Sequence, residues 1–154
     1  MQQTAICLRR AGWEILVHDE KRQQWPTPYL FTAKDLFLEA AKASTSCILI
    51  VDEGWKVFTN RAEDFGNQWL CNESRHQGHT LLMGSQRPNQ VLPSVRSCFE
   101  TCFCFALPFE DAKEVVADFG FEKDLAERIR SLQRTLCVKL EHFGEPVETR
   151  FSPA

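Results

Sequence analysis

The sequence predicts an α/β fold: a three-layer sandwich in which a mostly parallel central sheet has helices on both faces. Short β-rich apolar runs alternate with longer segments of helical periodicity, which is typical of such sheets. Residues 47–51 (CILIV) are apolar throughout, as in a strand buried on both faces. The 154 residues, 44% of them hydrophobic, suit one domain over residues 1–154.

The first half of the chain supplies two helices and two strands. Residues 2–11 are expected to form a helix that stops at Gly12, and residues 13–18 (WEILVH) a strand. A polar loop with prolines follows. Thr32 is expected to cap a helix over 33–44 that places Leu36, Phe37, Ala40 and Ala41 on one face. Residues 47–51 form the next strand.

The second half repeats the alternation. The expected elements are a helix within 60–77, a strand at 79–84, a helical turn at 94–97, a strand within 98–108, helices at 109–119 and 123–132, and a strand at 134–140. Gly120 separates the last two helices, and an irregular tail is expected after the final strand.

Charge and composition exclude several classes of function. The net charge of −3 gives no overall attraction to nucleic acid, so DNA contact would need a local basic patch or a partner. No segment has the roughly 18 consecutive apolar residues of a membrane span, and the N-terminus lacks the features of a signal peptide. We therefore expect a cytoplasmic chain in which the seven cysteines are mostly buried free thiols.

The cysteines do not form a recognisable metal motif. Cys98, Cys102 and Cys104 lack the paired spacing of structural zinc sites, and Cys102 and Cys104 alternate with phenylalanines, as in a buried strand. We expect no zinc. A catalytic pair of Cys71 and His76 is a weaker alternative, because nothing in the sequence brings the two together.

Two carboxylates, Asp52 and Glu53, directly follow the most apolar strand. One carboxylate can hold Mg²⁺ and the other can orient a water, although an ordinary acidic turn has the same pattern. Ligands of parallel sheets bind beyond the carboxyl ends of the strands. Asp19 and Gln86 are expected at such ends too, so these side chains could converge at one edge.

The order of several motifs resembles the HerA/FtsK superfamily of P-loop ATPases, which move DNA and include phage packaging ATPases. The matching residues are ILIVDE at 48–53, Arg75 ahead of Gly78, and SQRP at 85–88. The resemblance implies a Walker B strand in which Asp52 holds Mg²⁺ and Glu53 polarises the attacking water. It also implies that Gln86 senses the γ-phosphate and that Arg75 is an arginine finger for the next subunit, with Arg96 the second choice.

The family's phosphate-binding loop, G-x-x-x-x-G-K-[ST], has no counterpart in this sequence, because none of the seven glycines precedes a lysine. The chain resembles such a domain from its first helix onward, either incomplete at its N-terminus, which we favour, or naturally shortened. In the family the missing strand lies between those expected at 79–84 and 98–108. Without it, these two strands must pair directly or leave a vacant position.

The resemblance implies Mg-ATP hydrolysis coupled to movement of double-stranded DNA by a homo-oligomeric ring. We expect this chain to be inactive alone, with Mg-ATP binding weak or absent, because the phosphate loop is missing. Two alternatives stay open: a non-enzymatic adaptor or regulatory subunit that docks on intact ATPase subunits, and an unrelated α/β interaction module.

Overall fold

The computed structural model describes residues 1–58 and 68–150, which form two compact units divided between Ser85 and Gln86. One domain over 1–154 stays a prediction. Within the described residues, no helix is both long and apolar enough to cross a membrane.

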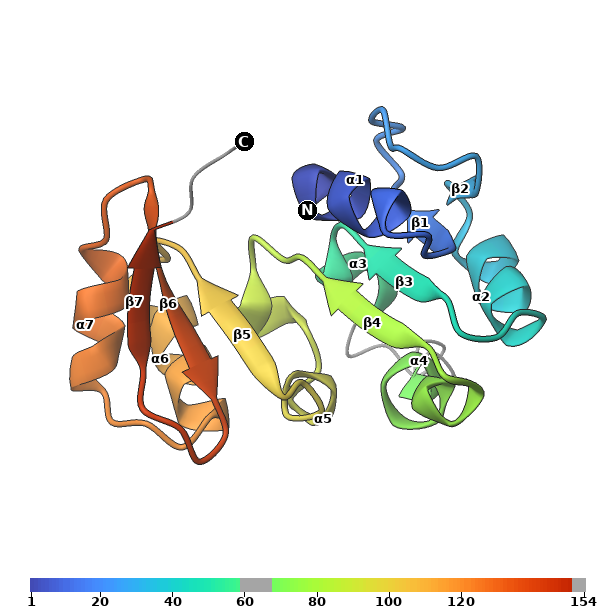
Figure 1. Cartoon of the computed structure of the whole chain (residues 1–154). Coiled ribbons are helices and arrows are strands. Elements are labelled where there is room, and N and C mark those ends of the chain that lie inside the picture. The colour runs from blue at the N-terminus through green and yellow to red at the C-terminus, as the bar shows by residue number, and fades with distance from the viewer. Residues whose placement is uncertain (59–67, 151–154) are drawn as a thin grey trace. The chain divides into compact units, whose positions relative to one another are not determined.

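The first unit is built on a four-stranded sheet that is entirely parallel (Figure 1). Its strand order is β2-β1-β3-β4. The strands are β1 (Ile15–His18), β2 (Leu30–Phe31), β3 (Ile48–Val51) and β4 (Thr80–Met83). All residues of β1 and β3 are buried, because helices cover both faces. The predicted α/β fold with a mostly parallel sheet is confirmed.

Helices on the two faces of this sheet enclose the core. α1 (Gln2–Arg10) packs Ala5 with the Ile15 and Val17 side of β1, whereas α2 (Lys34–Lys42) packs Phe37 against His18 on the other side. The shorter helical elements are α3 (Gly54–Val57), α4 (Trp69–Asn72) and the 3₁₀ turn η2 (Ser74–Gln77). Residues 59–67 of the helix expected within 60–77 lie outside the described residues.

Two details of α2 differ from the expectation. The cap position is Ala33 rather than Thr32, and no side chain caps the helix. Leu36 is 57% exposed, whereas Phe37 and Ala41 are buried. The helix begins at Lys34, and its inward stripe is centred on positions 37 and 41, one turn apart. Leu36 is rotated by about 100° from Phe37 and therefore leaves the core.

The second unit has an antiparallel sheet of its own, which differs from the single parallel sheet expected. The strand order is β5-β6-β7, with β5 (Thr101–Cys104), β6 (Leu136–Glu141) and β7 (Val147–Arg150). β7 falls where an irregular tail was expected; all four of its residues are exposed, so its sequence lacks the burial pattern that predicts a strand. β4 and β5 belong to different sheets and therefore do not pair directly.

Helices α6 (Phe109–Asp118) and α7 (Asp124–Arg130) cover one face of this antiparallel sheet. Val115, Val116 and Ile129 from the helices form one core with Val138 and Leu140 of β6. The 3₁₀ turn η3 (Pro88–Gln90) and α5 (Pro93–Arg96) complete the unit.

Arg96 holds the start of the second unit to α6. Its side chain is buried and forms ion pairs with Asp118 and, at 3.1 Å, with Glu114. It also donates to the carbonyls of Pro88 (3.0 Å) and Val91 (2.8 Å). A planar guanidinium can make several such bonds at once, so this residue stabilises the fold locally.

His18 gives the first unit a predictable response to pH. It is 2% exposed, lies against Phe37, and its Nε2 has no hydrogen-bond partner. Burial lowers its pKa, with Lys56 and Lys34 acting in the same direction and Glu20 and Asp19 opposing. Below about pH 6.5 the unfolded chain takes up a proton that the folded chain does not, so stability falls as the pH falls.

We expect His18→Phe to reduce this loss. The measurement is urea unfolding at pH 7.5 and pH 5.5 for the wild type and the variant. The wild type should lose more free energy of unfolding between the two pH values than His18→Phe does. Equal losses would show that His18 does not carry this pH dependence. His76→Phe, at an exposed histidine, is the matched control.

Candidate functional site

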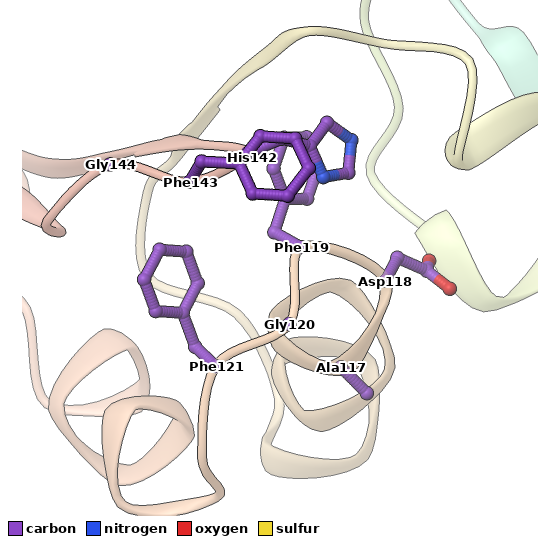
Figure 2. A pocket seen from close by; sticks show the side chains of 8 residues that line it. All are labelled: Ala117, Asp118, Phe119, Gly120, Phe121, His142, Phe143 and Gly144. Atoms are coloured by element: carbon purple, nitrogen blue, oxygen red, sulfur yellow. The ribbon is translucent and has the colours of Figure 1, made fainter.

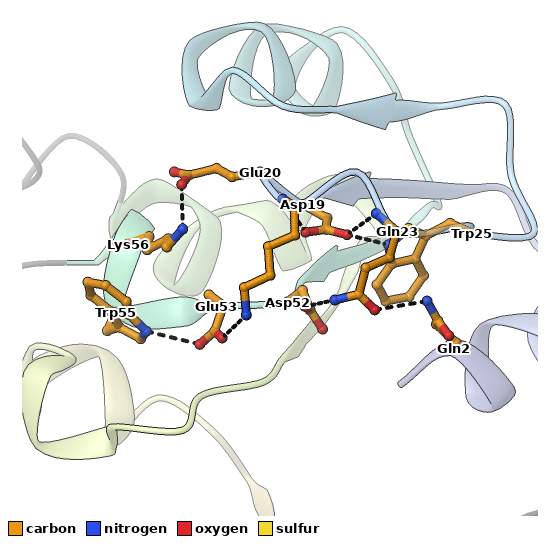
Figure 3. A network of polar contacts seen from close by, with 10 residues as sticks. Gln2, Asp19, Glu20, Gln23, Trp25, Asp52, Glu53, Trp55 and Lys56 are labelled. Carbon is orange, nitrogen blue, oxygen red and sulfur yellow. Dashed lines mark hydrogen bonds and ion pairs between the residues drawn. The ribbon is translucent and has the colours of Figure 1, made fainter.

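The candidate site lies beyond the carboxyl ends of β1 and β3, where four carboxylates gather (Figure 3). β1 and β3 pair in register from Ile15 with Ile48 to His18 with Val51. The amide of Asp52 still donates to the carbonyl of His18, at 3.2 Å, so Asp19 and Asp52 emerge side by side. Glu20 and Glu53 are the next residues of the two segments.

Asp19 organises the loop after β1 and is 2% exposed. Its carboxylate accepts hydrogen bonds from the amide of Lys21 (2.8 Å), the amide of Gln23 (3.0 Å) and the indole Nε1 of Trp25 (2.9 Å). Burial alone would raise the pKa of Asp19, but these hydrogen bonds outweigh burial and hold the pKa below its usual value. Asp19 is thus committed to holding its own loop.

Asp52 is half-buried and less firmly held. Its Oδ2 is 3.4 Å from Nε2 of Gln23, and the Oε1 of Gln23 accepts from Nε2 of Gln2 in α1, at 3.1 Å. Burial raises the pKa of Asp52, and the charges of Asp19 and Glu53 add to this, while Lys21 opposes it. A carboxylate in such surroundings is stabilised when a cation binds it.

Glu53 has both carboxylate oxygens engaged. Oε1 pairs with Nζ of Lys21 at 3.0 Å, and Oε2 accepts from Nε1 of Trp55 at 2.9 Å. The side chain of Glu53 is 11% exposed, whereas that of Lys21 is 50% exposed. The neighbouring pair of Lys56 and Glu20 closes this side of the cluster.

Arg75 and Gln86, the other two predicted site residues, belong to other segments of the chain. Arg75 is in η2, exposed, and makes no ion pair with the residues that the structure describes. Gln86 is exposed and is the first residue of the second unit. Arg96, the second choice for the finger, is engaged within the second unit by four groups and is not available as a finger without breaking them.

Sequence reasoning missed the residues that bind the carboxylates. The residues not assigned to the site are Lys21, Gln23, Trp25 and Trp55. An aspartate at a strand end followed by a polar loop is the available signal, since Asp often binds backbone amides two residues on. Nothing local to residues 19–25 indicates that Lys21 reaches residue 53.

None of the seven cysteines, all of them among the described residues, forms a disulfide. Three are buried (Cys47, Cys104, Cys137), while Cys7 and Cys98 are exposed, so burial is less general than expected. The sulfurs of Cys102 and Cys104 are 3.5 Å apart; their hydrogen bond lowers the pKa of Cys102 and raises that of Cys104. In the described part of the chain, no three His, Cys, Asp or Glu side chains are placed to hold a metal by themselves.

A separate pocket of about 420 Å³ lies in the second unit, between the end of α6 and the β6–β7 hairpin (Figure 2). Its lining includes Phe119, Phe121, His142 and Phe143, with His142 stacked on Phe119 at 4.5 Å. None of the predicted site residues lines this pocket. It is therefore distinct from the carboxylate cluster.

Comparison with known structures gives the fold. The chain is similar to the genome packaging NTPase B204 of Sulfolobus turreted icosahedral virus 2 in complex with ATP-gammaS, at a TM-score of 0.79 and 14% identity, over 97% of this chain and 88% of that one. B204, the DNA-packaging ATPase of Sulfolobus turreted icosahedral virus, matches at a TM-score of 0.78 and 15% identity, with the same coverage. No protein-family model and no curated protein matches the sequence.

The likeness defines the class of fold: the chain has the α/β, P-loop NTPase-like fold of the viral packaging ATPases. It extends over nearly the whole chain, including the second unit with its antiparallel sheet. At this level of identity the likeness concerns the fold alone, so the role of each residue depends on its own surroundings.

Asp19→Ala is expected to destabilise the chain by about 2–4 kcal/mol, because it leaves buried donors without an acceptor. Asp19→Asn should cost less, since one acceptor oxygen remains. The free energy of urea unfolding at pH 7 measures both variants. Gln24→Ala, at an exposed position of the same loop, is the control and should change little. An Asp19→Ala variant as stable as the control would contradict the role given to Asp19.

Proposed function

We propose that this chain is an ATPase-type domain of a motor that packages or translocates double-stranded DNA. The observation that carries the proposal is the position of the Asp52–Glu53 pair, which follows the carboxyl end of β3 in the parallel sheet. The chain around this sheet has the fold of the packaging ATPases. Known structures of B204 were obtained with ATP-gammaS, AMPPCP and AMP, so a nucleotide site belongs to that relative.

The position of α1 supports a nucleotide at this edge. Gln2, at the start of α1, is linked through Gln23 to Asp52, so the N-terminal end of this helix adjoins the carboxylates. A helix N-terminus attracts phosphate through its free amides, and α1 has no acidic residue in its first turn to oppose this.

The residues present fit a magnesium ion brought in with the nucleotide. Mg²⁺ in such sites keeps several waters and binds one or two carboxylates together with phosphate oxygens. The half-buried Asp52, whose pKa is raised by burial and by the charges of Asp19 and Glu53, offers one such ligand. When bound, the ion would neutralise charge that develops on the phosphates.

Glu53 is proposed as the general base. An attacking water would give its proton to the carboxylate while its oxygen bonds to the γ-phosphorus, and the bond from that phosphorus to the β–γ bridging oxygen breaks. The products are ADP and phosphate. Glu53 can do this only when an oxygen is free, because both oxygens are occupied in this structure.

Gln86 and Arg75 complete the proposal as residues that act on the γ-phosphate. Gln86 is proposed as the polar sensor and Arg75 as the finger for the neighbouring subunit of a homo-oligomeric ring. The exposure of both side chains supports these roles, because each must reach beyond its own segment. We assign no residue to DNA contact.

The affinity of this chain for Mg-ATP is proposed to be weak, since its sequence holds no G-x-x-x-x-G-K-[ST] loop to wrap the phosphates. The alternative function is an adaptor or regulatory relative that docks on intact ATPase subunits. Lys21 and Trp55 bind the two carboxylate oxygens of Glu53. If both contacts persist when nucleotide is present, Glu53 cannot act as a base, and the adaptor alternative is favoured.

The first test expresses the longest reading frame that contains this sequence, and asks whether it adds an in-frame phosphate loop. If it does, we expect that chain to hydrolyse Mg-ATP, and Glu53→Gln to lower its kcat by about 10²–10⁴. Phosphate release is measured with and without double-stranded DNA. Glu100→Gln, at an exposed carboxylate of the second unit, is the control. An unchanged kcat in Glu53→Gln would exclude Glu53 as the base.

The second test concerns the adaptor alternative and Arg75. If an ATPase subunit with an intact phosphate loop co-purifies with this chain, we expect Arg75→Ala to lower that partner's ATPase rate by about 10³–10⁵. The exposed Arg10→Ala is the matched control. A partner rate that is the same with Arg75→Ala as with wild type would remove the finger assignment.

A further inference from the structure

The contact between Lys21 and Glu53 links two segments that are 32 residues apart in the sequence. Lys21 stands on the loop after β1, and Asp19 fixes that loop by accepting from the amides of Lys21 and Gln23. The backbone of Lys21 is thus held while its side chain is half-exposed and extends to Oε1 of Glu53. The hydrogen bonds of Asp19 therefore determine where Lys21 lies.

Lys21 is surrounded by more negative charge than one carboxylate provides. Its pKa is raised by the hydrogen bond and charge of Glu53, with the charges of Asp52 and Asp19 adding to this. Half-exposed ion pairs are weak because water and salt screen them. An anion of higher charge that enters beside Asp52 can therefore draw the ammonium group away from Glu53.

We propose that Lys21 exchanges partners: it binds Glu53 in the nucleotide-free chain and binds the phosphate groups of the nucleotide when that enters. The exchange gives the site a phosphate-binding lysine from outside any glycine-rich loop. It also frees Oε1 of Glu53, so the base becomes available only with phosphate in place. This inference rests on the proposed function for the identity of the anion as a nucleoside triphosphate.

Only one of the two carboxylate oxygens of Glu53 loses its partner in this exchange. When Lys21 leaves, Oε2 of Glu53 still accepts from the indole of Trp55 at 2.9 Å. The carboxylate therefore stays in place with one oxygen free. Lys56 does not substitute for Lys21, because it pairs with Glu20.

Inorganic tripolyphosphate tests the exchange, since it carries the phosphate chain without base or sugar. Binding is measured by isothermal titration calorimetry with MgCl₂ on the chain of residues 1–154. The variants are Lys21→Gln, Glu53→Gln and the double variant. Arg22→Gln is the control, because it removes an equal charge from the next residue of the same loop.

Exchange predicts effects of opposite sign. Glu53→Gln should tighten binding by up to about five-fold, because Lys21 no longer has to leave a partner. Lys21→Gln should weaken binding by about ten-fold, and Arg22→Gln by much less. In the double variant the tightening should vanish, and the affinity should equal that of Lys21→Gln alone.

Three results would overturn the exchange. They are tightening by Glu53→Gln that persists without Lys21, equal effects of Lys21→Gln and Arg22→Gln, and no binding by either the wild type or Glu53→Gln. The first would show a general charge effect. Each outcome is separate from the proposed motor function, which fails when the full reading frame containing this sequence hydrolyses no ATP.

Discussion

The buried carboxylate of Asp19 is the constraint on which the site depends. A charge at the end of a central strand is costly to bury unless hydrogen bonds satisfy it, and one indole and two amides do so for Asp19. Those bonds shape the loop that carries Lys21 to Glu53 and Gln23 to Asp52. The geometry at the edge of the sheet thus follows from one residue that takes no part in the proposed chemistry.

Much of the fold could be predicted because periodicity reports burial. The apolar run of β3 and the alternation of strands and helices gave the α/β class, and Asp52 with Glu53 marked the sheet edge. β7 was not predicted, because all its residues are exposed and no apolar pattern marks it. Leu36 was wrongly expected in the core, because the buried face of α2 is narrower than the run of apolar residues in its sequence. Lys21 could not be assigned, since its contact depends on tertiary structure across 32 residues.

The two units differ in how their sheets are made. The first unit encloses two fully buried parallel strands, so polar side chains in its core need hydrogen-bond partners. His79 is buried and has a partner at each ring nitrogen: Nδ1 contacts the amide of Cys47, and Nε2 contacts the carbonyl of Ala41. The second pairs antiparallel strands under two helices. The proposed nucleotide chemistry lies mainly with the first, while Gln86 opens the second.

The anchoring of Arg96 sets a limit on Gln86. Pro88 is buried, and its carbonyl is held by the Arg96 guanidinium at 3.0 Å. Gln86 stands two residues ahead of that fixed point, a tether of about 7 Å when fully extended. Any larger excursion has to pull on α6 through Asp118 and Glu114, which turns a local displacement into strain on a whole helix.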